Sequence, residues 1–224
     1  MKSKIFSGFS LTEVMISMAV VGIIAAITVP VVTNHSQKQA FLTMLQKNYV
    51  ELDENLSSLQ TENIYGGLRR SILARTNADA GNFLRRYYNV KLDCGATAQP
   101  CFAAAYSSTD DPATTVNFSC AGYSVTVASG AAICIIPSNE DEDGGLNPAT
   151  VYIDTNGTEI PNISGRDLFR LFIFEDFTVD EVDPTLLNDV KEATRTTLID
   201  DCLTSTDGSG CFSRIYNDNW KMNY

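Results

Sequence analysis

A segment without a single charged residue, residues 14–33 (VMISMAVVGIIAAITVPVVT), constrains this chain more than any other feature. An α-helix rises about 1.5 Å per residue, so a helix of this length spans about 30 Å, the thickness of the hydrocarbon core of a bilayer. Lys2 and Lys4 precede the segment and favour a cytoplasmic N-terminus, although Lys38 beyond it weakens that bias. We therefore expect one N-terminal membrane helix that carries a soluble domain outside the cytoplasm.

The rest of the chain has the composition of a folded, acidic domain. The 224 residues suffice for one sizeable domain with an appendage. An apolar content of 44% excludes wholesale disorder, which requires low hydrophobicity combined with high charge. The 16 basic residues are outnumbered by 27 acidic ones, so the net charge is −11. This balance argues against a nucleic-acid partner, because a phosphate backbone attracts clusters of Lys and Arg.

Six cysteines all lie beyond the apolar segment, as expected for a domain in an oxidising compartment. An even number predicts disulfides, and sequence alone does not choose among the possible pairings. Short loops favour bridges between neighbouring cysteines. Zinc is disfavoured, because no C-x-x-C spacing occurs and the only histidine is His35, close to the membrane segment. The preferred pairs are Cys94–Cys101, Cys120–Cys134 and Cys202–Cys211.

The sequence contains no recognisable catalytic constellation. With His35 as the only imidazole, a Ser-His-Asp or Cys-His site is not expected. No glycine-rich phosphate loop follows a strand-like segment, and the many carboxylates show no regular spacing. We therefore expect that the chain is not an enzyme and that it needs no cofactor.

The N-terminus does not match an ordinary secretory signal. Such a signal has an apolar core of about 7–15 residues and is cleaved after that core. Here the core is longer, and the sequence GFSLTE (residues 8–13) places the carboxylate of Glu13 at its edge. Considered by itself, Glu13 is interpreted as an interfacial acid that remains hydrated. Deep in a membrane helix a carboxylate costs roughly 2.5–3.5 kcal/mol.

Residues 4–16 (KIFSGFSLTEVMI) resemble the class III signal of type IV pilins and type II secretion pseudopilins. The shared elements are a short basic leader, a Gly–Phe junction, a glutamate five residues after the cut and an uninterrupted apolar helix. The resemblance implies that an inner-membrane prepilin peptidase cleaves between Gly8 and Phe9 and methylates the new amine of Phe9. It also implies that the apolar helix is retained, with 1–8 as leader, 9–35 as membrane and filament-core helix, and 36–224 as the extracytoplasmic head.

The same resemblance assigns roles to individual residues of the signal. Gly8 has no side chain, so an extended segment can approach the peptidase closely. Glu13 is expected to pair with the amine of Phe9 in an adjacent subunit, which would favour one stagger between subunits. Pro30, aided by the flexibility of Gly22, is expected to kink the helix; a helix that ends at Pro30 is the alternative.

Beyond Pro30 an apolar residue recurs every three or four positions, the pattern of an amphipathic helix. We therefore predict one helix over about residues 9–60, apolar all round in its first half and on one face in its second. A coiled coil is the weaker alternative for the second half, because strong e/g charge pairs are missing. The residues of the apolar face are Phe41, Leu45, Tyr49, Leu52, Leu56 and Leu59.

The remaining sequence predicts an α+β head. Short helices are expected over 68–73 and 82–88 and a longer one over 186–203. A hairpin is expected over 123–136, with further strands at 150–154 and 168–174. Asn156-Gly157 predicts a tight type I′ turn, which explains these residues without an ion. Calcium is the alternative there, because oxygen ligands gather near the turn. Those candidate ligands are Asp154, Asn156, Glu159 and Asp167.

Two further segments of the head have more than one interpretation. A basic cluster is interpreted as a solvated helix face or as partners for the many acids of the head. Its alternative is a contact between subunits through acidic loops such as residues 140–143. The segment between Cys202 and Cys211 is expected to be a flexible, disulfide-bounded loop, with the aromatic C-terminus pinned to the sheet. The basic cluster consists of Arg69, Arg70, Arg75, Arg85 and Arg86.

Taken together, these expectations describe a pilin-like α+β protein. The apolar half of its long helix protrudes, and the amphipathic half packs on an antiparallel sheet in a head with disulfides. The expected function is a structural subunit of a type IV pilus or pilus-like filament; a type II secretion pseudopilin is the alternative, and a membrane-tethered binding domain that never polymerises a lesser one. The resemblance implies prepilin peptidase, an inner-membrane assembly platform and other pilin subunits as partners. The protein would reside in the bacterial inner membrane before assembly, then on the cell surface, or in the periplasm if it is a pseudopilin.

Overall fold

The computed structural model describes residues 10–62, 67–139 and 147–224, with the backbone alone at positions 30, 31 and 34. By its internal contacts the chain divides into two compact units, Met1–Ala40 and Phe41–Tyr224. Helix α1 (Leu11–Glu62) supplies the described part of the first unit and the first element of the second. The helix predicted over about 9–60 is thus observed, and the alternative in which it ends at Pro30 is wrong.

The second unit is a head built on an antiparallel sheet of six strands in the order β1-β4-β5-β6-β7-β8. The sequence predicts only four strands. The hairpin expected over 123–136 forms from β4 and β5. The strands are β1 (Val90–Gly95), β4 (Tyr123–Val127), β5 (Ala132–Ile136), β6 (Ala149–Asp154), β7 (Leu168–Ile173) and β8 (Val179–Asp180).

Helices and a small second sheet surround these strands. The predicted short helices appear as α2 (Gly67–Arg70), the 3₁₀ helix η1 (Ile72–Ala74) and α3 (Asn77–Tyr87). The helix expected over 186–203 is α4 (Asn188–Asp201). Not predicted are α5 (Cys211–Asn217) and the two-stranded sheet of β2 (Ala105–Ser107) and β3 (Thr115–Asn117).

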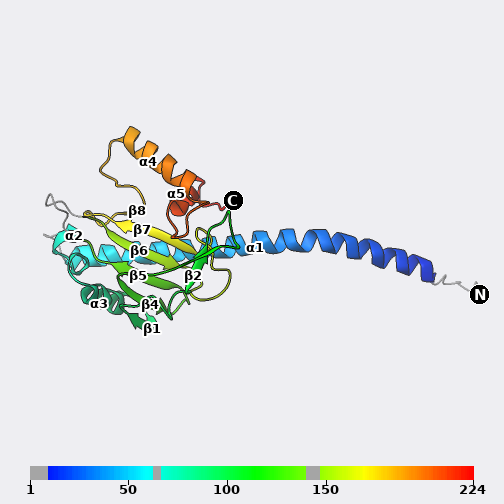
Figure 1. Ribbon diagram of the computed structural model, residues 1–224, viewed down its shortest axis with the longest axis horizontal. Helices are drawn as coiled ribbons and strands as arrows, with labels where there is room; N and C mark the ends of the chain where they lie inside the picture. Colours follow the sequence, from blue (N-terminus) through cyan, green and yellow to red (C-terminus); the bar gives the residue numbers. More distant parts are fainter. Residues whose placement is uncertain (1–9, 63–66, 140–146) are drawn as a thin grey trace, which may run out of the picture. The chain divides into compact units, whose positions relative to one another are not determined.

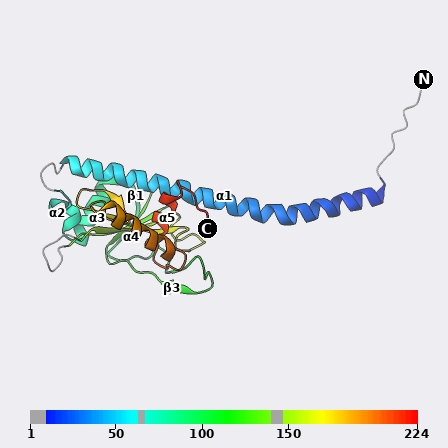
Figure 2. The same cartoon turned by 90° about the horizontal axis from the view of Figure 1, so that it is seen from above.

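The two faces of the main sheet bury different partners, as the alternation of side chains along a strand requires. On β5, Ile133 belongs to the hydrophobic cluster that includes Leu45, Leu52 and Leu56 of α1. The neighbouring Cys134 belongs to a second cluster with residues of the β2–β3 region. Figure 1 shows the second half of α1 behind the sheet, and Figure 2 shows β3 on the opposite side of the head. The amphipathic half of α1 therefore packs on its own head, as expected, and not in a coiled coil.

The connection between β6 and β7 differs from the predicted tight turn. The two strands are antiparallel neighbours, but they are joined by residues 155–167 and not by a two-residue turn. Gly157 has a φ of +69°, whereas Asn156 is not among the residues with positive φ. A type I′ turn needs positive φ at both central positions, so that prediction is wrong. The long connection instead folds onto the buried side chain of Asp154 at the end of β6.

The C-terminus returns to the core through aromatic packing. Trp220 lies with its ring 5.6 Å from that of Tyr49 on α1 and 5.9 Å from that of Phe212 on α5. The hydroxyl of Tyr224 donates to the carbonyl of Gly165 at 2.6 Å. The aromatic end is therefore fixed, but mainly against α1, α5 and the β6–β7 connection.

Candidate functional site

The first part of α1 is the most apolar surface of the described chain. Over Leu11–Val29 its mean hydropathy is 2.1 and none of these 19 residues is buried. Leu11 is 80% exposed and Met18 is 71% exposed. An apolar patch of this size in water would promote association, so the segment needs lipid or other protein chains around it.

The few polar side chains in this segment do not obstruct burial in an apolar medium. The hydroxyl of Ser17 donates to the carbonyl of Glu13 at 2.7 Å, and the hydroxyl of Thr28 donates to the carbonyl of Ile24 at 2.9 Å. Such bonds to the preceding turn satisfy the hydroxyl group within the helix itself. A bilayer core contains no water that could bind these hydroxyl groups instead. Hydroxyls that are hydrogen-bonded within the helix are therefore compatible with lipid and with a dry helix bundle.

Glu13 is part of a capping box at the start of α1. Its carboxylate accepts a hydrogen bond from the backbone N–H of Ser10 at 2.8 Å, while its own N–H donates to the Ser10 hydroxyl at 3.3 Å. This reciprocal pair satisfies two of the donors that a helix N-terminus otherwise leaves without partners. The sequence interpretation missed this role, although the pattern S-x-x-E directly before an apolar run is its signature. Glu13 thus has a partner within its own chain.

The other residues of the N-terminal signal have more limited structural evidence. Gly8 and Phe9, the expected cleavage and methylation positions, lie outside the described residues. Gly22 lies within α1, and a Cβ atom built on it would meet no atom within 4 Å. Pro30 also lies within α1, so the expected kink there stays a prediction.

All six cysteines form disulfides in the head. The pairs are the three that short loops favour, and the chain has no free cysteine among the described residues. A bridge across a loop this short stabilises a domain by about 2–3 kcal/mol, mainly by restricting the unfolded chain. The bonds are Cys94–Cys101, Cys120–Cys134 and Cys202–Cys211.

The residues considered for calcium divide into two environments. Asp154 and Asp167 are fully buried, whereas Glu159 is exposed. Asp154 accepts hydrogen bonds from the N–H groups of Asn156 (3.1 Å) and Gly157 (2.8 Å) and from the hydroxyl of Tyr106. In residues 10–62, 67–139 and 147–224, no group of three or more His, Cys, Asp or Glu side chains is arranged to hold a metal. Calcium binding was only the alternative at this turn, and the hydrogen-bond donors around Asp154 already occupy its carboxylate oxygens.

Burial changes the acidity of these carboxyl groups. Removal from water raises the pKa of Asp154 to about 7. Burial also raises the pKa of Asp167 well above its usual range, and the nearby charge of Asp154 adds to the effect. At neutral pH this part of the head therefore tends to retain a proton.

Glu181, next to β8, supports the start of helix α5. The N-cap of α5 is Gly210, which has no side chain to accept a hydrogen bond. The carboxylate of Glu181 accepts instead from the N–H groups of Gly210 and Ser213, both at 2.6 Å. The neighbouring Asp180 binds Arg195 of α4 at 2.5 Å. The last residue of β8 and the residue after it therefore bind both C-terminal helices.

We expect the stability of the head to fall as the pH rises from about 4.5 to about 7. Burial raises the pKa of Glu181 to about 7, above its ordinary value of 4.5, despite the two N–H donors. Below pH 4.5 Glu181 is protonated in both the folded and the unfolded chain. Between pH 4.5 and about 7 it is protonated only in the folded chain, so unfolding releases a proton. The free energy of unfolding then decreases by about 1.4 kcal/mol per pH unit for each such group. Urea unfolding of the full chain in detergent, repeated across this pH range, measures the free energy of unfolding. A Glu181→Gln variant should show a shallower decrease with pH. A wild-type free energy that stays constant or rises with pH would contradict the prediction.

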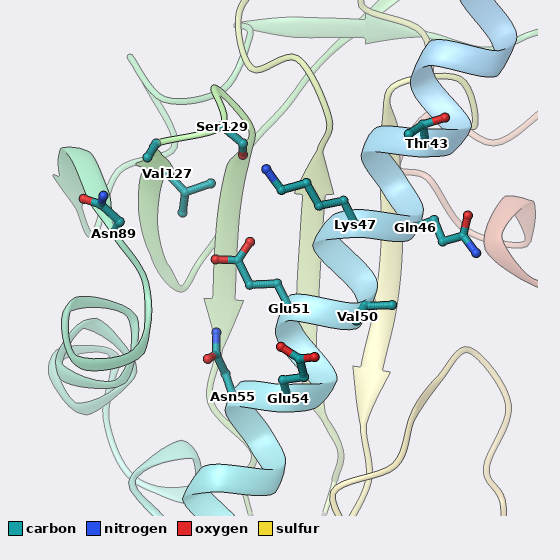
Figure 3. Close-up of a pocket in the computed structure, with 11 residues that line it drawn as sticks. Thr43, Gln46, Lys47, Val50, Glu51, Glu54, Asn55, Asn89, Val127 and Ser129 are labelled. Atoms are coloured by element: carbon teal, nitrogen blue, oxygen red, sulfur yellow. The ribbon is translucent and has the colours of Figure 1, made fainter.

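A groove of about 810 Å³ lies between α1 and the β4–β5 turn. In Figure 3, Lys47 and Glu51 extend from α1 towards Val127 and Ser129, while Gln46 and Val50 point to the other side of the helix. Its lining contains carboxylates, amides and one lysine, but neither histidine nor cysteine. The groove therefore combines these polar side chains with the apolar Val50, Val127 and Ala128.

The basic cluster is engaged in part with acids of the same head. Arg85 binds Asp93 at 2.8 Å and Arg86 binds Glu62 at 2.9 Å, which agrees with the interpretation as partners for acids. The acidic loop 140–143, the alternative partner, lies outside the described residues.

Comparison with known families is informative at the N-terminus alone. Residues 4–29 match the family model described as "Prokaryotic N-terminal methylation motif". No curated protein and no solved structure matches the chain. The match covers the expected cleavage junction, Glu13 and most of the apolar helix, so the chain carries the class III prepilin signal of type IV pilins and type II secretion pseudopilins.

Proposed function

We propose that this protein is a structural subunit of a type IV pilus or pilus-like filament that polymerises through its N-terminal helix. One observation supports this above all: an apolar helix that coincides with the matched methylation motif and has no buried residue over Leu11–Val29. Such a helix can lie in lipid before assembly and against identical helices afterwards. The head, with its disulfides, suits an extracytoplasmic compartment.

The proposal implies a sequence of partners and locations. Prepilin peptidase removes residues 1–8 at the inner membrane and methylates the amine of Phe9. An assembly platform in the same membrane then transfers the subunit from lipid into a filament with other pilins. The protein acts as building material and not as an enzyme, and the assembled form is located on the cell surface.

Replacing Gly8 with a bulky residue tests the processing step. We expect Gly8→Leu to leave nearly all of the protein as unprocessed precursor, because a side chain at this position keeps the scissile bond away from the peptidase. The mature N-terminus is identified by mass spectrometry of protein purified from membranes of a strain that contains a prepilin peptidase. Ser7→Leu, one residue further from the junction, serves as the control. A wild-type chain that begins beyond Val32, with the apolar helix removed, would contradict the proposal.

A second experiment separates the pilus from the secretion pseudopilin. Antibodies against the head should label surface fibres on wild-type cells, and a deletion strain should lack those fibres. If the deletion instead abolishes the release of secreted proteins while surface fibres persist, the protein is a pseudopilin that acts in the periplasm. A wild-type protein that is processed but remains a monomer in the membrane would point to a tethered binding domain.

A further inference from the structure

The two edges of the main sheet carry opposite charges. The outer strands are β1 at one edge and β8 at the other. Helix α3 contacts β1 and β4, and α4 is joined to β8 by the bond between Arg195 and Asp180. In Figure 1, α3 and β1 lie at the bottom of the head and α4 lies at the top. The two helices therefore lie at opposite edges of the sheet.

The β1 edge has an excess of basic residues, although β1 itself also carries the exposed Asp93. Residues 67–91 contain six basic residues and a single acid, in a chain with 27 acids. We define the basic edge as Arg85, Arg86, Lys91 and Leu92; all four are exposed, with Leu92 at 43%. Arg85 and Arg86 also bind acids of their own head, and these exposed pairs are worth about 1 kcal/mol or less. A lysine on an outer strand also discourages unspecific pairing of strands.

The opposite edge is acidic. Residues 175–201 contain nine acids and two basic residues. Helix α4 has no buried residue. We define the acidic helix as Leu187, Asp189, Val190 and Glu192, all exposed, with Leu187 at 74% and Val190 at 45%. The basic edge thus presents the exposed Leu92 and the acidic helix the exposed Leu187 and Val190, each among charged side chains whose excess has opposite sign at the two edges.

We propose that the basic edge of one subunit docks against the acidic helix of the next copy of this chain. Opposite charges on two separate patches of one molecule favour a head-to-tail contact, because each subunit then offers one patch to each neighbour. A head-to-tail contact of this kind leaves one patch of each kind for the next subunit, so it extends into an open series wherever its rotation does not close a ring. This inference rests on the proposed filament and names the surfaces through which the heads meet.

Charge reversal at each edge tests the proposal in full-length chains produced in cells that assemble the filament. We expect Arg86→Glu with Lys91→Glu, or Glu192→Lys with Asp189→Lys, to lower the yield of sheared filaments about tenfold. A chain that carries all four changes should recover to within about twofold of the wild type, because the signs are complementary again. Asp110→Lys with Asp111→Lys, which changes two exposed acids between β2 and β3, is the matched control and should assemble normally.

Co-expression of the two reversed chains gives the sharpest outcome. The chain with Arg86→Glu and Lys91→Glu has acidic charges at both edges, and the chain with Glu192→Lys and Asp189→Lys has basic charges at both. Neither chain should assemble alone. In an alternating series, however, every contact joins an acidic edge to a basic one. We expect filaments that contain both chains in equal amounts, quantified by mass spectrometry. If each reversed chain assembles alone as the wild type does, or if no combination restores assembly, the docking proposal is wrong. If the wild-type chain itself forms no filament, the proposed function fails instead.

Discussion

Glu13→Gln should leave the start of α1 intact and yet reduce filament assembly at least about tenfold. Glutamine can still accept the hydrogen bond from Ser10, since capping boxes use Glu or Gln at this position. It lacks the negative charge that we expect to pair with the amine of Phe9 in an adjacent subunit. Sheared filaments are measured by immunoblot, and the mature N-terminus by mass spectrometry, which should show normal removal of residues 1–8.

Ser10→Ala is the complementary variant. It removes the hydroxyl that accepts from the N–H of Glu13 but retains the charge of Glu13. Loss of such a cap costs about 1 kcal/mol of helix stability, so we expect assembly within about threefold of the wild type. Normal filaments from Glu13→Gln would contradict the charge-pairing role. An equal loss in both variants would instead make the capping box the important feature.

Glu181→Ala should strongly destabilise the head, because this buried carboxylate caps helix α5. The variant leaves the N–H groups of Gly210 and Ser213 buried without an acceptor. Each such group costs about 1–3 kcal/mol, so we expect a loss of about 3 kcal/mol. For a domain of this size the midpoint of thermal unfolding should fall by roughly 6–12 °C. The measurement is circular dichroism of the full chain in detergent.

Two variants support the interpretation of this result. Glu181→Gln retains one acceptor oxygen and should unfold at a temperature between those of the wild type and the alanine variant. Glu192→Ala removes an exposed carboxylate from α4 and should leave the midpoint within about 1 °C. A midpoint for Glu181→Ala that also stays within about 1 °C would show that α5 does not depend on this cap.

The parts of the fold with strong periodicity could be predicted from the sequence. The spacing of Leu45, Leu52 and Leu56 indicates a helix with one apolar face, and these residues are buried as that pattern requires. The alternation around Ser129-Gly130 indicates the β4–β5 hairpin. The cysteine pairs follow from short loop lengths. Each of these signals is local, so no knowledge of distant contacts is needed.

Other elements depend on contacts far apart in the sequence. Strand β1 carries exposed residues such as Lys91 and Leu92 and becomes a strand because it pairs with β4. Helix α5 begins at a glycine and receives its cap from Glu181, 29 positions earlier in the chain. At Asn156-Gly157 the local turn signal was misleading, because Asp154 organises a longer connection. At the N-terminus, by contrast, the capping box was local and could have been recognised.

The β6–β7 connection and the last disulfide occupy the same small volume. A Cβ atom on Gly165 would lie 2.3 Å from the sulfur of Cys211, and one on Gly208 would lie 2.8 Å from the backbone of Phe169. Two segments about 40 residues apart in the sequence thus contact each other at positions where only hydrogen atoms fit. The packing of the connection and the position of the Cys202–Cys211 bridge are consequently coupled, because any side chain at residue 165 would displace one or the other.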